Sequence, residues 1–273
     1  MKKISLINRI NSRCPYLILL TFLAVVFIVT LCLRSSFAQE TTGKTPGAIF
    51  YQANIYYQEG KFEAAIKSYE KIIDLGLESG NIYYNLGNSY FKKGELGLAV
   101  LNYEKAKVFM PNDSDLRSNY DYALQRLNLE PQLSGNWLER TVYGLFQAQS
   151  IDSLAMLLFF IYIVLTALFI LNLFIRRLKR FCGFMACVLI ILFILSAFGL
   201  NNKINYLNKT AIVVSQEADV KFEPLENATT YFKLSEGSKV EVVEKTEDWY
   251  KVRRFDTKLG WVSRGVLRQI LIK

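Results

Sequence analysis

Residues 83–111 have the sequence YYNLGNSYFKKGELGLAVLNYEKAKVFMP, and this stretch decides the fold of the first half of the chain. It repeats, with substitutions, a segment that begins 34 residues earlier. Small residues, tyrosines and glycines match between the copies: Ala53, Tyr56, Gly60, Ala65 and Tyr69 recur as Gly87, Tyr90, Gly94, Ala99 and Tyr103. The small residues let two helices approach closely, and the tyrosines fill the space between them. The pattern therefore predicts two successive helix pairs.

Helix-ending residues lie where such pairs need them. Gly60 and Gly94 stand at the expected end of each first helix, where a positive φ is useful, and Pro111 stops the last helix. This spacing resembles the tetratricopeptide (TPR) repeat, with copies at 46–79 and 80–113. The first copy departs from the TPR pattern, with Ile49, Gln52 and Ala53 in the opening triplet and Leu77 in place of proline. The alternative is an unrelated amphipathic helix pair with tyrosines in its core.

Stacked repeats need a capping element, and the next segment supplies one. Residues 114–129 are predicted to form a capping helix with an apolar stripe of Leu116, Tyr120, Leu124 and Leu127, which completes a repeat domain over 39–130. Residues 131–152 are predicted to be a linker followed by an interfacial helix. In that helix Asn136 and Glu139 resemble a capping box, and Trp137 would lie at headgroup level. Docking of this helix onto the repeats is the alternative.

The first helix of each TPR repeat lines a concave face. The residues at these positions predict that the face binds a peptide. The candidate residues, which we expect to be exposed, are Tyr51, Asn54, Tyr57, Tyr84, Asn85, Asn88, Phe91 and Lys92. An asparagine amide both donates and accepts, as an extended peptide backbone requires. TPR domains that clamp a C-terminal carboxylate also need cations, whereas the matching positions hold Phe50, Asp115 and Asn119. A solvated polar face without a ligand is the alternative.

Two apolar runs predict a membrane hairpin. Residues 153–175 carry no charge and would span about 35 Å as a helix, and residues 181–200 would span about 30 Å. The five residues between them, 176–180, include the four cations Arg176, Arg177, Lys179 and Arg180. Such a basic turn is typical of the cytoplasmic side. Both soluble segments would then lie on the opposite side, whereas a buried soluble hairpin is the alternative.

The N-terminus and the composition restrict the compartment and the chemistry. Residues 1–38 resemble a signal peptide, or an uncleaved anchor, with a basic start and Ser36-Phe37-Ala38 before the cleavage point. Much of the net charge of +9 lies at this start and in the basic turn, so it reports orientation and gives no indication of nucleic-acid binding. The chain has no histidine, which excludes Ser-His-Asp and Cys-His nucleophiles. The cysteines, Cys14, Cys32, Cys182 and Cys187, all lie in apolar segments, which excludes disulfides in the soluble parts.

The C-terminal segment 201–273 changes to short β-rich runs. These runs are Ala211–Val214, Val240–Val243, Trp249–Val252 and Gly260–Val262. With Gly237 in a turn they resemble the small bacterial SH3-like barrel of the SH3b type, for which we expect five strands. Trp249, Tyr250 and Trp261 are the candidate ligand-binding residues of the barrel surface, and a place in its core and rim is the alternative. The resemblance implies peptide or cell-wall binding.

The order of parts is similar to one known family. Signal, two TPR repeats, a membrane hairpin and an SH3-like domain resemble the BatE-type proteins of the bacterial aerotolerance (Bat) operon. The stretch Pro111-Asn-Asp-x-Asp-Leu-x-x-Asn119 also resembles theirs. The resemblance implies a bacterial inner-membrane protein with both soluble domains in the periplasm. Its partners would be membrane-anchored von Willebrand A-domain proteins and a complex linked to a MoxR-type ATPase, and its role oxidative-stress tolerance.

We therefore expect a multi-domain membrane protein that acts as a scaffold. The repeats would hold a partner protein, and the SH3-like domain would hold a second partner or the cell wall. An envelope sensor is the alternative function, although a cytoplasmic turn of about five residues leaves no output domain. We expect no enzyme activity, cofactor or metal, because the carboxylates are scattered and none forms a pair at a useful spacing.

Overall fold

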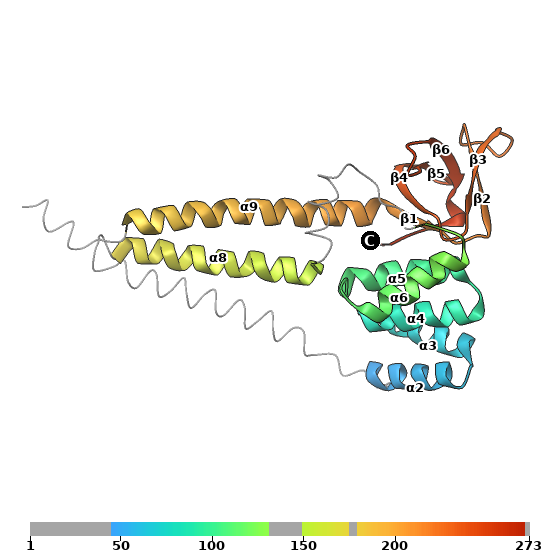
Figure 1. Cartoon of the computed structure of the whole chain (residues 1–273), viewed down its shortest axis with the longest axis horizontal. Coiled ribbons are helices and arrows are strands. Elements are labelled where there is room, and N and C mark those ends of the chain that lie inside the picture. The colour runs from blue at the N-terminus through green and yellow to red at the C-terminus, as the bar shows by residue number, and fades with distance from the viewer. Residues whose placement is uncertain (1–44, 131–148, 175–178, 271–273) are drawn as a thin grey trace, which may run out of the picture. The chain divides into compact units, whose positions relative to one another are not determined.

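The structure is a computed structural model that describes residues 45–130, 149–174 and 179–270. Every helix and strand named below belongs to one compact unit that begins at Pro46. The predicted order of helix pairs, two long apolar helices and a small β domain is confirmed (Figure 1). Several predicted features lie outside the described residues: the signal or anchor, the helix with Trp137, and Arg176 and Arg177 of the turn.

Five helices form the first part, and they pack in a stack (Figure 1). They are α2 (Pro46–Gln58), α3 (Phe62–Asp74), α4 (Gly80–Lys93), α5 (Leu96–Phe109) and α6 (Ser114–Arg126). Gly60 and Gly94 have φ of 74° and 90°, which confirms their role after the first helix of each pair. Ser79 and Asp113 cap the N-termini of α4 and α6, because their side chains accept hydrogen bonds from the Ile82 and Leu116 amides.

The core of this stack depends on the predicted small residues. Ala53, Ala65 and Ala99 are fully buried. At Gly87 a Cβ atom would lie only 2.7 Å from the Tyr103 ring, so α4 and α5 can approach only if this position is glycine. Tyr103 is itself almost fully buried between the two helices. The close packing of each pair therefore follows from the repeated small residues.

Two long helices, α8 (Ile151–Phe174) and α9 (Lys179–Lys209), run side by side (Figure 1). Both are long and apolar enough to cross a membrane. Only 11% of the most apolar stretch of each is buried, whereas a core helix of a soluble protein would be mostly covered. The α9 helix continues to Lys209, past the end of the predicted apolar run at residue 200, and strand β1 (Thr210–Val213) begins at the next residue.

The β domain is one antiparallel sheet of seven strands in the order β3-β2-β6-β5-β4-β1-β7. Its further strands are β2 (Glu217–Lys221), β3 (Thr230–Ser235), β4 (Lys239–Lys245), β5 (Trp249–Arg253), β6 (Leu259–Ser263) and β7 (Leu267–Gln269). The expectation of five strands is wrong. Strands β2 and β3 have mostly exposed or half-buried side chains and β7 is only three residues long, so none of them forms an apolar run in the sequence.

The β domain has its own core and also contributes to the core of the repeats. Val220, Val252 and Val262 are buried within the sheet's own cluster. Two residues of this part, Ile212 and Ile270, instead pack in the same apolar cluster as the repeats. The repeats and the β domain therefore share buried apolar surface.

Candidate functional site

The predicted asparagines form hydrogen bonds with one another and with buried tyrosines. Asn54 Oδ1 on α2 accepts hydrogen bonds from Tyr69 Oη at 2.6 Å and from Asn85 Nδ2 on α4 at 3.2 Å. Burial raises the pKa of Tyr69 to about 12, so its hydroxyl remains protonated and donates at neutral pH. Asn54 thus joins the second helix of its own repeat to the first helix of the next.

The same arrangement recurs 34 residues later. Asn88 Oδ1 accepts hydrogen bonds from Tyr103 Oη at 2.8 Å and from Asn119 Nδ2 on α6 at 2.9 Å. Asn119 Nδ2 also donates to Tyr84 Oη at 2.8 Å. Asn119 stands to Asn88 as Asn85 stands to Asn54, so α6 occupies the place of the first helix of a third repeat. We call Asn54, Asn85, Asn88 and Asn119 the asparagine network.

These contacts change the predicted site in one respect. The sequence pattern predicts that Asn54, Asn85 and Asn88 are exposed, whereas all four members of the network are half-buried and hydrogen-bonded. Each amide uses only one of its two polar atoms in these bonds. The other atoms, Asn54 Nδ2, Asn85 Oδ1, Asn88 Nδ2 and Asn119 Oδ1, have no hydrogen-bond partner in the described part of the chain, and none of them is sealed from solvent.

Aromatic side chains lie one helical turn from the network. Tyr51 precedes Asn54 by three residues and is 69% exposed. Phe91 follows Asn88 by three residues, Tyr122 follows Asn119 by three, and the Phe91 and Tyr122 rings are 5.4 Å apart. Side chains three apart share a helix face. We call the surface formed by these aromatic residues and the asparagine network the asparagine face.

The remaining predicted residues of this site have different exposures. Tyr57 and Tyr84 are half-buried, and their rings pack on Phe62 at 5.6 Å and on Tyr103 at 6.3 Å. Lys92 is exposed and makes no ion pair within the described residues. Tyr122, which is 51% exposed, was not among the predicted residues. It could have been found from the 34-residue register, because it stands at the position of Asn54 and Asn88 in a third copy.

The predicted barrel surface is mostly interior. Trp249 and Tyr250 are buried and Trp261 is half-buried, so core and rim describe these residues better than a ligand-binding surface. Other aromatic residues are exposed instead: Phe222 and Phe255 are 57% and 62% exposed. Sequence periodicity could not identify them, because they lie just outside strands β2 and β5.

The described part of the chain has few other features of functional chemistry. It contains no group of three potential metal ligands among its cysteines and carboxylates, and its cysteines, Cys182 and Cys187, are free. Of the predicted topology determinants, Lys179 and Arg180 are exposed at the start of α9. Arg176 and Arg177 lie in the part that is not described.

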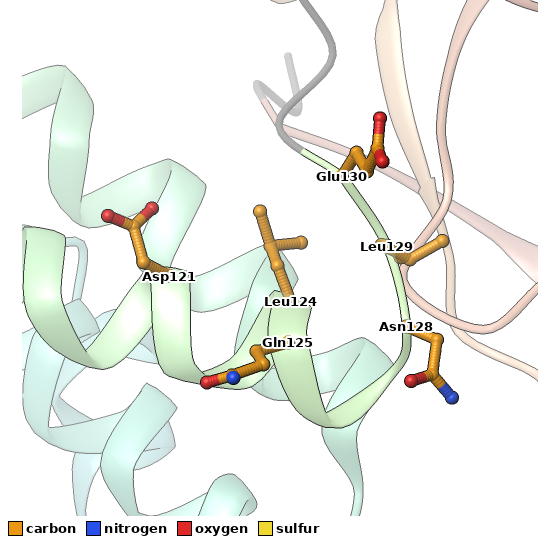
Figure 2. Close-up of a pocket in the computed structure, with 6 residues that line it drawn as sticks. All are labelled: Asp121, Leu124, Gln125, Asn128, Leu129 and Glu130. Carbon is orange, nitrogen blue, oxygen red and sulfur yellow. The ribbon is translucent and has the colours of Figure 1, made fainter.

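An open depression of about 420 Å³ lies beside the end of α6 (Figure 2). Figure 2 shows its lining: Asp121, Leu124 and Gln125 from α6, and Asn128, Leu129 and Glu130 from the chain that follows. None of these residues belongs to the asparagine face. The depression ends at the last residue before an undescribed segment, so we assign it no ligand.

Two comparisons with protein families agree with this geometry. The family model of the TPR repeat matches residues 53–94. The model of the bacterial SH3 domain matches residues 217–268. The chain therefore contains TPR and bacterial SH3 domains. A comparison with curated proteins found no match.

Proposed function

We propose that the protein is a non-catalytic, membrane-anchored scaffold whose TPR domain binds a partner protein along the asparagine face. One observation carries the proposal: each asparagine of the network keeps one polar atom accessible and unbonded within the described residues. In chain order, the unbonded donor groups of Asn54 and Asn88 alternate with the unbonded acceptor oxygens of Asn85 and Asn119. TPR and bacterial SH3 domains both support a role in binding proteins or cell-wall material.

The form of the bound segment follows from this chemistry. An extended peptide presents N–H and C=O groups, which match the free carbonyl oxygens and amide groups of the network. Exposed Tyr51 and Tyr122 would supply apolar contact at little entropic cost. A clamped C-terminal carboxylate is less suited, since Phe50, Asp115 and Asn119 occupy the positions where cations would be needed. The expected ligand is therefore an internal, extended stretch of a partner.

Membrane anchoring is supported by the poor burial of α8 and α9. Their apolar side chains are left uncovered by the rest of the described chain, as expected for helices in lipid. The basic residues at 176–180 favour a cytoplasmic turn, which would place the repeats and the SH3 domain on the opposite side. We propose the periplasmic side of a bacterial inner membrane.

The cellular context rests on the similarity to BatE-type proteins. By that similarity, the partners would be von Willebrand A-domain membrane proteins and a complex linked to a MoxR-type ATPase, in tolerance to oxidative stress. The alternative is an envelope sensor or a wall-binding module in which the SH3 domain is the main recognition element. Exposed Phe222 and Phe255 on that domain favour this alternative, since aromatic surfaces bind peptides and sugars.

Site-specific photocrosslinking in intact membranes would test the binding face. A photoreactive phenylalanine analogue replaces Tyr51 on the asparagine face, or Lys67, which is exposed on α3, as a matched control. We expect one dominant protein adduct from position 51 and none from position 67. Adducts of equal yield from both positions, or no adduct from position 51, would contradict binding at this face. A third probe at Phe255 tests the alternative.

A further inference from the structure

A buried carboxylate on the repeats pairs with a lysine of the SH3 domain. Glu104 on α5 is only 5% exposed. Its Oε1 atom accepts hydrogen bonds from Lys239 Nζ on β4 at 2.6 Å and from Tyr120 Oη on α6 at 2.5 Å. Lys107 Nζ lies 3.5 Å from the same atom. A charge buried to this extent is tolerated only when it is paired, and here the main partner comes from another domain.

In a second polar contact the carboxylate belongs to the SH3 domain and its partner to the repeats. Glu236, in the turn between β3 and β4, accepts a hydrogen bond from the Gly97 amide at 2.6 Å. Gly97 lies in the first turn of α5, where backbone amides have no partner within the helix and a carboxylate is stabilised by the helix dipole. The Glu95 side chain does not cap this helix. The SH3 domain therefore supplies the capping group that the repeat lacks.

The repeats and the SH3 domain approach each other closely at two glycines. A Cβ atom on Gly97 would lie 2.8 Å from both Glu236 Cγ and the Val213 carbonyl oxygen. A Cβ atom on Gly237 would lie 2.4 Å from Leu127 Cδ1. Ile212 and Ile270 extend the contact by joining the apolar core of the repeats. The surface between the two domains thus combines close packing, buried apolar area and two hydrogen-bonded carboxylates, one from each domain.

We propose that the β3–β4 turn of the SH3 domain, Glu236 to Lys239, is a docking element that holds the TPR domain in place within the same chain. Strand β1 follows α9 without an intervening loop, so a domain docked in this way is fixed to the membrane hairpin. The asparagine face would then be presented at a constant position relative to the hairpin. Any external ligand of the SH3 domain must use a surface other than this turn. The inference does not depend on what the asparagine face binds.

Hydrogen exchange of the full chain in lipid nanodiscs, followed by mass spectrometry, would test the docking. Lys239→Met keeps the length of the side chain but leaves Glu104 buried without its main partner. We expect exchange to accelerate about a hundredfold in α5 and α6 as well as in β4, because unpaired buried charges are costly. Lys233→Met is the matched control, since Lys233 is an exposed lysine that pairs with Glu217 at the surface. It should leave exchange in the repeats unchanged.

Two further variants keep the test decisive if Lys239→Met unfolds. The double variant Glu104→Gln, Lys239→Met removes both charges and should recover most of the protection, because the pair is coupled. Val252→Ala weakens the SH3 core at a fully buried site that belongs to the domain's own cluster. We expect it to accelerate exchange in α5 and α6 as well. Parental exchange rates in the repeats of both Lys239→Met and Val252→Ala would overturn the docking proposal.

Discussion

Asn85 on α4 donates a hydrogen bond through its side-chain amide to the side-chain oxygen of Asn54 on α2, at 3.2 Å. The two residues are 31 positions apart, and the pair Asn88 and Asn119 repeats both the contact and the separation. Both amides in each pair therefore have a structural role at the bonded atom, while the other polar atom of each remains accessible. The same side chains thus combine a structural role with the proposed binding role.

Asn54→Ala should destabilise the TPR domain. The change removes the acceptor of the Tyr69 hydroxyl, which is fully buried, and an unsatisfied buried hydroxyl costs about 1–3 kcal/mol. Thermal unfolding of the full chain, followed by circular dichroism, measures the loss. Tyr69→Phe provides the control background, because no hydroxyl is then left without a partner. A cost of Asn54→Ala that is just as large in that background would show that the hydrogen bond is not its source.

Gly87→Ala should also destabilise the repeats, through overpacking. Its new methyl group would meet the Tyr103 ring at 2.7 Å, and such a clash costs about 1–3 kcal/mol. Ala99→Leu should act in the same way at the fully buried partner position. Gly47→Ala on α2 is the matched control, because nothing lies within 4 Å of its added Cβ and alanine favours helix by up to about 1 kcal/mol. Melting temperatures that change equally at positions 47 and 87 would contradict the proposed register.

The sequence could predict features that depend on local periodicity. Ala53, Gly87 and Ala99 mark close helix contacts at a fixed spacing, so the helix pairs follow from the sequence alone. The Asn54–Asn85 bond could not be predicted, because it depends on how successive repeats rotate against each other. Helix periodicity distinguishes an outward position from a buried one, but it does not show that outward asparagines contact one another.

Contacts between the two domains could not be predicted from the sequence for a related reason. Glu104 and Lys239 are 135 residues apart and lie in different domains. Each resembles an ordinary charged residue on the solvated side of its own helix or strand. Only the arrangement of the domains brings them together, with Glu104 buried and Lys239 half-buried. The same holds for Gly97, whose close approach to Glu236 has no local signature in the sequence.

The Glu104 pair should give stability that depends on acid pH. Burial alone would raise the pKa of the Glu104 carboxyl, but the charges of Lys239 and Lys107 and the hydrogen bonds from Lys239 and Tyr120 outweigh it and lower the pKa to about 2. The folded pKa lies below the ordinary value of 4.5, so the stabilisation is fully present above pH 4.5 and is lost as the pH falls toward 2. The pKa of Lys239 is raised despite its burial, mainly by Glu104, so the lysine stays charged throughout this range.

Chemical denaturation at several pH values would measure this effect. At pH 7 the variant Glu104→Gln should be less stable than the parent by about 3 kcal/mol, because the half-buried Lys239 is left without its counter-charge. The difference should shrink between pH 4.5 and 2, as the parent carboxyl takes up a proton. Comparison with the variant at each pH cancels the contribution of all other carboxylates. A difference that stays constant from pH 7 to 2.5 would show that the carboxylate charge does not stabilise the fold.

Cysteine labelling should place the TPR and SH3 domains on the same side of the membrane. In a background with the native cysteines replaced by alanine, Lys67→Cys on α3 and Thr229→Cys before β3 introduce exposed thiols in the two domains. We expect both to react with a membrane-impermeant maleimide in cells whose outer membrane is permeabilised. Lys179→Cys, exposed at the start of α9, should stay unlabelled until the inner membrane is opened, because the positive-inside rule favours a cytoplasmic location for a basic turn. If position 67 or position 229 alone reacts, α8 and α9 do not form a transmembrane hairpin, and the two domains cannot present their surfaces to the same compartment.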